Sequence, residues 1–90
     1  METITNEELN NFRSIQYSFQ NLSDEELLKQ YYLWNINELK IKLSQTDYKA
    51  IKYAEGLISE EDYMYIKNDR QIWRKQINEY EKLIKELESK

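Results

Sequence analysis

The sequence predicts an all-α protein, a small bundle of about four helices in a single domain. Turn-forming residues are scarce, with one glycine and no proline among 90 residues, whereas β-rich folds use both in their turns. Three segments, 5–8, 23–26 and 59–62, start with serine or threonine and continue with acidic residues, as helix N-termini do. Apolar side chains recur every three or four residues through the last third of the chain. Well over half of the residues are therefore expected to be helical.

The first two capping segments each precede an apolar pattern of helical spacing. We expect a helix over residues 6–20, where the apolar residues are Leu9, Phe12, Ile15 and Phe19. A second helix is expected over residues 24–43, with Leu22 as a hydrophobic staple before it. This helix carries two apolar stripes, so it should pack on more than one neighbour.

A third, short helix is expected over residues 47–55. The run Ser44-Gln45-Thr46-Asp47 is typical of a turn followed by an N-cap, with Tyr48 as an inward-facing anchor. Gly56 is the only glycine and follows directly. It is expected to end the helix in a left-handed conformation, which glycine adopts without a Cβ clash.

The last helix is expected to run from Ser59 to the C-terminus, roughly 40 Å at 1.5 Å per residue. Its heptad a and d positions form a coiled-coil-like seam: Tyr63, Ile66, Arg70, Trp73, Ile77, Tyr80, Ile84 and Leu87. Arg70 is the single charged member. Its stem can pack in the seam while its guanidinium binds a carboxylate, for which we expect Glu55 or Asp47.

This last helix is longer than the helix predicted over residues 24–43, which leaves an overhang of about two turns. The overhang predicts self-association, although the first helix could cover it instead. The chain is also rich in tyrosine. Tyrosines commonly anchor interfaces, but they can equally form the partly exposed rim of a hydrophobic core. The candidate residues for a partner or oligomer seam are Tyr65, Trp73, Ile77, Tyr80, Ile84 and Leu87.

The composition argues against catalysis and against metal or cofactor binding. The chain has no cysteine and no histidine, which removes the usual nucleophiles, histidine general bases and zinc ligands. Its carboxylate clusters lie in first turns of helices, where they complement the helix dipole. We therefore expect no enzyme, no catalytic residues, no metal and no cofactor.

Nucleic-acid and membrane binding are not expected either. The net charge is −4, which disfavours nucleic acid, and the basic residues Lys67, Arg70, Arg74 and Lys75 are expected to pair with nearby carboxylates. No apolar run is long enough for a membrane span, and Met1-Glu2-Thr3 does not open a signal peptide. The chain is expected to be soluble.

Residues from about 40 to 80 carry a combination of motifs. Thr46-Asp47-Tyr48 is followed by Glu55-Gly56 and then by Arg70-Gln71-Ile72-Trp73-Arg74. The combination resembles a C-terminal helical segment of bacteriophage tail-assembly chaperones and tail-fibre-associated proteins. The resemblance implies a phage-tail-like helical hairpin over residues 39–90, while residues 1–38 form N-terminal helices without such a resemblance.

The resemblance implies a phage or prophage protein that assists or forms part of tail assembly without enzymatic activity. An alternative is a phage-encoded inhibitor of a host defence protein, similar to an anti-CRISPR protein, that occludes a binding surface. The expected partner is then a phage tail protein or a host defence protein. The expected location is the host bacterial cytoplasm, with the virion as an alternative.

Overall fold

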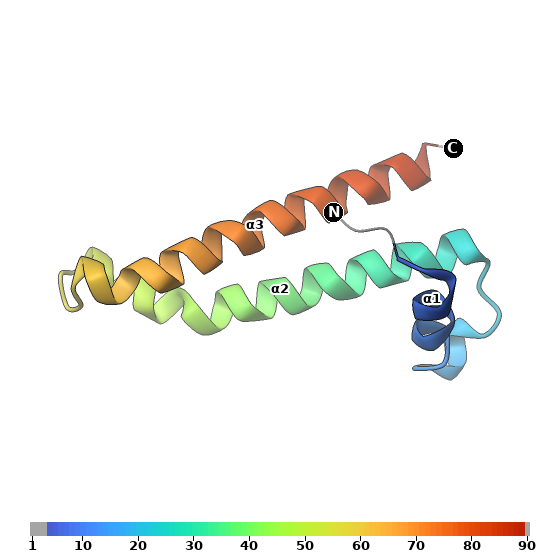
Figure 1. The fold of residues 1–90 in the computed structure, drawn as a ribbon, viewed down its shortest axis with the longest axis horizontal. Helices are drawn as coiled ribbons and strands as arrows, with labels where there is room; N and C mark the ends of the chain where they lie inside the picture. The colour runs from blue at the N-terminus through green and yellow to red at the C-terminus, as the bar shows by residue number, and fades with distance from the viewer. Residues whose placement is uncertain (1–3, 90) are drawn as a thin grey trace.

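The computed structural model describes residues 4–89, which form three α-helices and a short 3-10 helix and contain no β-strand. Helix α1 spans Asn6–Arg13, the 3-10 helix η1 spans Tyr17–Phe19, α2 spans Asp24–Ala54 and α3 spans Glu60–Glu88. Helices α2 and α3 form a long antiparallel hairpin, and α1 lies beside the N-terminal end of α2 (Figure 1). The all-α prediction is confirmed, but these residues form three α-helices rather than four.

The helix starts follow the capping signals of the sequence. Thr5, Ser23 and Ser59 each accept a hydrogen bond at 3.1 Å from the backbone N–H three residues later. The Thr5 and Ser23 hydroxyls also donate to the carboxylates of Glu8 and Glu26, at 3.2 and 3.1 Å. Each cap thus satisfies a backbone donor that the first helical turn leaves without a partner.

Helix α2 continues without a break through residues 44–47, so the predicted turn and the separate helix over 47–55 are wrong. The Thr46 hydroxyl lies 3.2 and 3.1 Å from the carbonyl oxygens of Lys42 and Leu43, a local bond that the helix accommodates. No glycine or proline interrupts the backbone hydrogen bonds here. Tyr48, expected to face inward, is consequently exposed on the surface of α2, as is Ile51.

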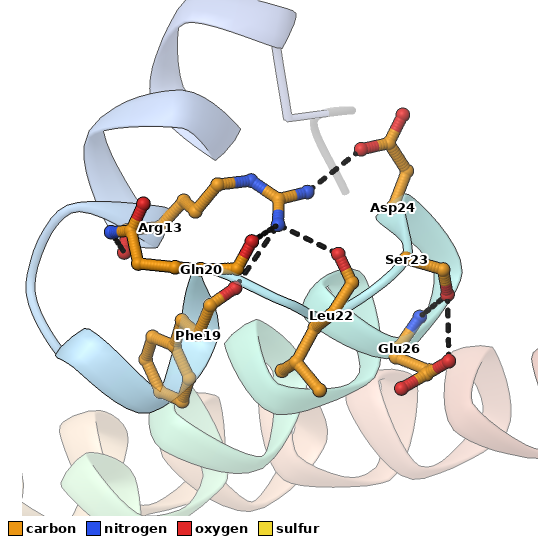
Figure 2. A network of polar contacts seen from close by, with 7 residues as sticks. All are labelled: Arg13, Phe19, Gln20, Leu22, Ser23, Asp24 and Glu26. Atoms are coloured by element: carbon orange, nitrogen blue, oxygen red, sulfur yellow. Dashed lines mark hydrogen bonds and ion pairs between the residues drawn. The ribbon is translucent and has the colours of Figure 1, made fainter.

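Helix α1 ends at Arg13, whereas the sequence pattern predicted a helix to residue 20. The Arg13 guanidinium donates to the carbonyl oxygens of Phe19 at 3.0 Å and Leu22 at 2.7 Å. It also forms an ion pair with Asp24 at 2.9 Å (Figure 2). These carbonyls would be engaged in helical bonds, or directed away from Arg13, if the helix continued. The arginine therefore stabilises a chain reversal that leads into α2.

The reversal brings two phenylalanines together over α2. The rings of Phe12 and Phe19 stack with centroids 5.0 Å apart, and both are buried with Leu27 in one hydrophobic cluster. Leu22 packs against the same cluster, which agrees with its predicted role as a staple before α2.

A second hydrophobic cluster holds the hairpin together. Ile36 and Leu39 of α2 are buried with Ile77 of α3. The partly buried residues packed around them are Leu43, Trp73, Tyr80 and Ile84. The predicted seam of α3 therefore faces α2.

The predicted overhang of α3 does not exist. Helix α2 has 31 residues and α3 has 29, so the two helices cover each other along their whole length. Lys29, near the start of α2, pairs with Glu88 at 2.7 Å, and both Ile84 and Leu87 are half-buried. The expected self-association through this end thus loses its structural basis. The predicted continuation of α3 to Lys90, like the interpretation of Met1–Thr3, lies outside the described residues.

Gly56 ends α2 as predicted. Its φ of 76° lies in the left-handed region. The N–H of Gly56 bonds to the carbonyl of Tyr53 at 3.0 Å, and the N–H of Leu57 bonds to that of Lys52 at 2.8 Å. These two bonds are those of a Schellman motif. Tyr53 also stacks on Tyr63 with centroids 4.5 Å apart, which joins the two helices next to the turn.

We predict that Gly56→Val lowers the free energy of unfolding by on the order of 1–2 kcal/mol, because a β-branched residue is strained at positive φ. A Cβ at this position would meet no atom within 4 Å, so the effect isolates backbone strain from steric overlap. Gly56→Asn is the matched control and should lose less, since asparagine tolerates this conformation. Urea denaturation of the three proteins measures the difference, and equal midpoints for valine and glycine would contradict the prediction.

Candidate functional site

Most of the residues expected to contact a partner are used within the chain itself. Trp73, Tyr80, Ile84 and Leu87 are half-buried and Ile77 is buried, and all but Leu87 belong to the cluster that joins α3 to α2. Tyr65 is different, with 79% of its surface exposed. Of the predicted partner residues, it is the one directed at solvent.

Arg70 is the centre of a polar clamp between the long helices. The residue is only 5% exposed. Its guanidinium donates to the Leu43 carbonyl at 2.8 Å, to the Thr46 hydroxyl at 2.7 Å and to the Asp47 carboxylate at 2.8 Å. The predicted pairing with Asp47 is confirmed, and Glu55 does not take part. The clamp satisfies a buried cation within the fold, so its role is structural.

The pairing expected for the other basic residues of α3 is wrong. The ion pairs within residues 4–89 are Arg13–Asp24, Lys29–Glu88 and Arg70–Asp47. Lys67, Arg74 and Lys75 are exposed and contribute to none of them. Their charges are therefore left in solvent along α3.

The side of α2 that points away from α3 carries an exposed apolar stripe, here called the outer α2 face. It consists of Trp34, Ile41, Tyr48 and Ile51, which are between 41% and 57% exposed. The first three are seven residues apart and so share one side of the helix. The side chains that contact α3, such as Ile36 and Leu39, lie on the opposite side.

Two lysines border this stripe. The ammonium groups of Lys49 and Lys52 lie 5.9 and 5.6 Å from the centre of the Tyr48 ring, within the range of cation–π attraction. Asp47 lies next to them in the chain, but its carboxylate is already bound to Arg70. Lys49 and Lys52 thus place positive charge next to Tyr48, whereas the exposed Glu55, seven residues after Tyr48, places a carboxylate on the same side of the helix.

The stripe continues into an open groove between α1 and α2 with a volume of about 510 Å³. Its walls are formed by Glu8, Asn11, Phe12, Ile15, Tyr31, Trp34 and Asn35. Trp34 belongs to both surfaces, and its ring meets that of Phe12 edge-on at 5.8 Å. Helix α1 therefore extends the apolar surface at the N-terminal end of α2.

A second exposed surface, the outer α3 face, consists of Met64, Tyr65 and Ile72. All three are exposed, and a shallow hollow of about 440 Å³ lies between Glu60, Glu61, Met64, Tyr65 and Asn68. This face has acidic residues at its N-terminal end, and Lys75 lies beside Ile72 further along the helix.

Within residues 4–89, no three acidic side chains are close enough to hold a metal ion. Over the same range, no helix is long and apolar enough to cross a membrane.

The pKa values of Tyr32 and Tyr80 are raised by burial and, to a lesser degree, by neighbouring tyrosines and carboxylates.

Comparisons with protein-family models, curated proteins and solved structures find no match to this chain. The resemblance of residues 40–80 to phage tail proteins therefore stays a prediction. Thr46, Asp47 and Tyr48 lie inside α2 instead of at a helix start, which departs from the arrangement expected for that motif. Glu55 and Gly56 form the end of α2, and Arg74 is exposed on α3.

Sequence reasoning missed the outer α2 face because the predicted turn at 44–47 divides it. With a break there, Trp34 and Ile41 belong to one helix and Tyr48 and Ile51 to another. The signal that could have revealed the face is the seven-residue spacing of Trp34, Ile41 and Tyr48, which is meaningful only along a single helix.

We predict that Arg70→Ala lowers the free energy of unfolding by about 1.5–3 kcal/mol, the usual range for hydrogen bonds to a charged group. The groups that lose a hydrogen bond to Arg70 are one carbonyl, one hydroxyl and one largely exposed carboxylate. The substitution therefore leaves no buried anion without a partner. Arg74→Ala is the matched control on the next turn of α3 and should change stability by less than about 0.5 kcal/mol. Equal losses in chemical denaturation would show that Arg70 is not a clamp.

We predict that the protein loses stability as the pH rises above about 10, the normal tyrosine pKa. The folded-state pKa values of Tyr32 and Tyr80 are raised. The contribution of these two neutral phenols to the stability of the fold is therefore fully present below the unfolded pKa. It is lost as the pH rises through the folded pKa, because the unfolded chain releases the phenolic protons more readily. Tyr80→Phe should show a shallower decline in urea midpoint between about pH 8 and pH 11. Tyr17→Phe, at an exposed position, should decline like the unaltered protein.

Proposed function

We propose that this chain is a non-enzymatic protein-interaction module that acts in bacteriophage tail assembly. One observation carries the interaction role: each long helix has one side committed to the hairpin and an opposite side with exposed apolar residues. The assignment to tail assembly rests on the resemblance of residues 40–80 to phage tail proteins. Tryptophan, tyrosine and isoleucine on the outer α2 face, and tyrosine, methionine and isoleucine on the outer α3 face, are accessible to a second protein. Exposed tryptophan and tyrosine side chains are common anchors of interaction sites.

The shape of the chain supports the same proposal. The described residues extend over 51 × 27 × 18 Å, and the hairpin holds its outer faces in place through a continuous seam. A surface that is ordered before binding loses less conformational entropy when a partner docks. The proposed mechanism is therefore docking of a partner chain along one side of a rigid helical rod, with no chemical step.

We predict that a photo-crosslinking amino acid at position 48 or 65 captures a tail protein in phage-infected or lysogenic bacteria. These positions lie on the outer α2 and outer α3 faces, whereas Gln76, exposed on α3 outside both apolar sets, provides a matched position that should give no product. Mass spectrometry identifies the captured chain, and capture in the reverse direction verifies it.

The identity of the captured protein decides between the two functions that the sequence suggests. A component of the tail supports the proposal. A host defence protein would instead support inhibition by occlusion of a binding surface. The absence of a specific product at both positions would contradict a role as an interaction module.

A further inference from the structure

We propose that the open groove between α1 and α2, here called the α1 groove, binds an arginine side chain of a partner protein; this assignment rests on the proposed role as an interaction module. The groove has a volume of about 510 Å³, and its lining combines aromatic rings with hydrogen-bond acceptors: Glu8, Asn11, Phe12, Ile15, Tyr31, Trp34 and Asn35. Glu8 is the one charged residue among them. A cation with a flat, partly apolar body matches this composition.

The aromatic wall of the groove leaves a ring face open to a ligand. Phe12 is buried, and its ring meets the Trp34 indole at 84° with centroids 5.8 Å apart. A perpendicular contact covers at most one face of the indole, and Trp34 is 41% exposed. A guanidinium can therefore stack on the uncovered face, while its methylene stem packs against Ile15, which is 55% exposed.

The polar side chains of the groove supply acceptors for a cation. The side-chain nitrogen of Asn35 donates to the Tyr31 carbonyl at 2.8 Å, which leaves the side-chain oxygen free to accept. The Glu8 carboxylate accepts from the Thr5 hydroxyl at 3.2 Å and has further lone pairs available. The N–H groups of a guanidinium form a fork that can reach two acceptors at once, whereas an ammonium is a compact point charge. The groove therefore favours arginine over lysine.

The charges around the groove are mostly negative. From residue 4 to residue 38, six carboxylates stand against two basic side chains: Glu7, Glu8, Asp24, Glu25, Glu26 and Glu38 against Arg13 and Lys29. Arg13 is paired with Asp24 at 2.9 Å. Lys29 is paired with Glu88 of α3 at 2.7 Å. The dipole of α1 adds about half a positive charge at its N-terminus, which the two glutamates of its first turn outweigh.

The residues further along α2 do not reverse this charge. Glu38 is exposed and lies one turn beyond Trp34 on the same side of the helix. Lys42 lies over the Trp73 ring of α3, 6.0 Å from its centre. Lys40 lines a different hollow, between α2 and α3, together with two glutamates of α3. The α1 groove is thus complementary to a positively charged side chain.

An NMR titration at physiological salt tests the proposal with 15N-labelled protein and three blocked pentapeptides. Each peptide has one central residue between alanines, which is arginine, lysine or citrulline; citrulline has nearly the shape of arginine but no charge. We expect the arginine peptide to shift the indole N–H signal of Trp34 and to bind at least about fivefold more tightly than the citrulline peptide. The lysine peptide should bind more weakly than the arginine peptide. The indole signal of Trp73, in the seam between α2 and α3, should stay in place.

Three variants locate the binding. Glu8→Gln removes the charge but keeps the helix cap, because glutamine also serves in a capping box; it should weaken binding of the arginine peptide at least about threefold and leave the citrulline peptide unchanged. Glu7→Gln makes the same change in net charge outside the lining and should alter the affinity by less than about twofold. Trp34→Leu, followed through the side-chain amide signal of Asn35, should weaken binding at least about fivefold.

Equal binding of the arginine and citrulline peptides, or an unchanged affinity in Glu8→Gln, would overturn the proposal. Equal binding of the lysine peptide would overturn the assignment to arginine. The chain has its own exposed arginine, Arg74. A dimer in light scattering that Arg74→Ala dissociates would assign the groove to a second copy and would overturn the proposal as well.

Failure of this inference and failure of the proposed function give different results. If the natural partner is captured in cells and its capture survives both Glu8→Gln and Trp34→Leu, the module function stands and the α1 groove is not its site. If the peptides behave as expected but no partner is captured in cells, the chemistry of the groove stands and the proposed function fails.

Discussion

The packing of one stripe of α3 along α2 is the constraint on which the rest of the structure depends. A two-helix hairpin has a single internal surface, and here that surface takes the a and d side chains of α3 together with Ile36, Leu39 and Leu43 of α2. Apolar side chains outside this seam cannot be buried within the hairpin. They are either covered by α1, as Leu27 is, or left exposed on the outer faces.

A buried arginine within an otherwise apolar seam constrains how the helices align. Arg70 reaches a carbonyl, a hydroxyl and a carboxylate from three residues of α2, and a shift of one helix along the other would break all three bonds. Polar groups at seam positions can specify register in this way, because an unsatisfied buried cation is unfavourable. The clamp lies between the aromatic contact near Gly56 and the Lys29–Glu88 pair at the other end, closer to the turn.

The arrangement links the fold directly to the proposed function. Because α2 and α3 are long and held in register, each outer face keeps its side chains at fixed intervals along the rod. Both outer faces carry acidic and basic side chains beside their apolar residues: Lys49, Lys52 and Glu55 on α2, and Glu60, Glu61 and Lys75 on α3. Charge alone therefore does not distinguish the two faces.

The sequence by itself determined the helix starts at Thr5, Ser23 and Ser59, the end at Gly56 and the seam of α3, because caps and periodicity act over a few neighbouring residues. The tertiary structure decided what happens where local signals conflict. Thr46 and Asp47 favour a cap in isolation, but in the fold they bind Arg70, more than twenty residues away, and α2 continues. Arg13 ends α1 by bonding to carbonyls beyond it. The outer α2 face exists only because α2 is continuous. Local preference alone does not predict this continuity, because it cannot show which long-range contact will override it.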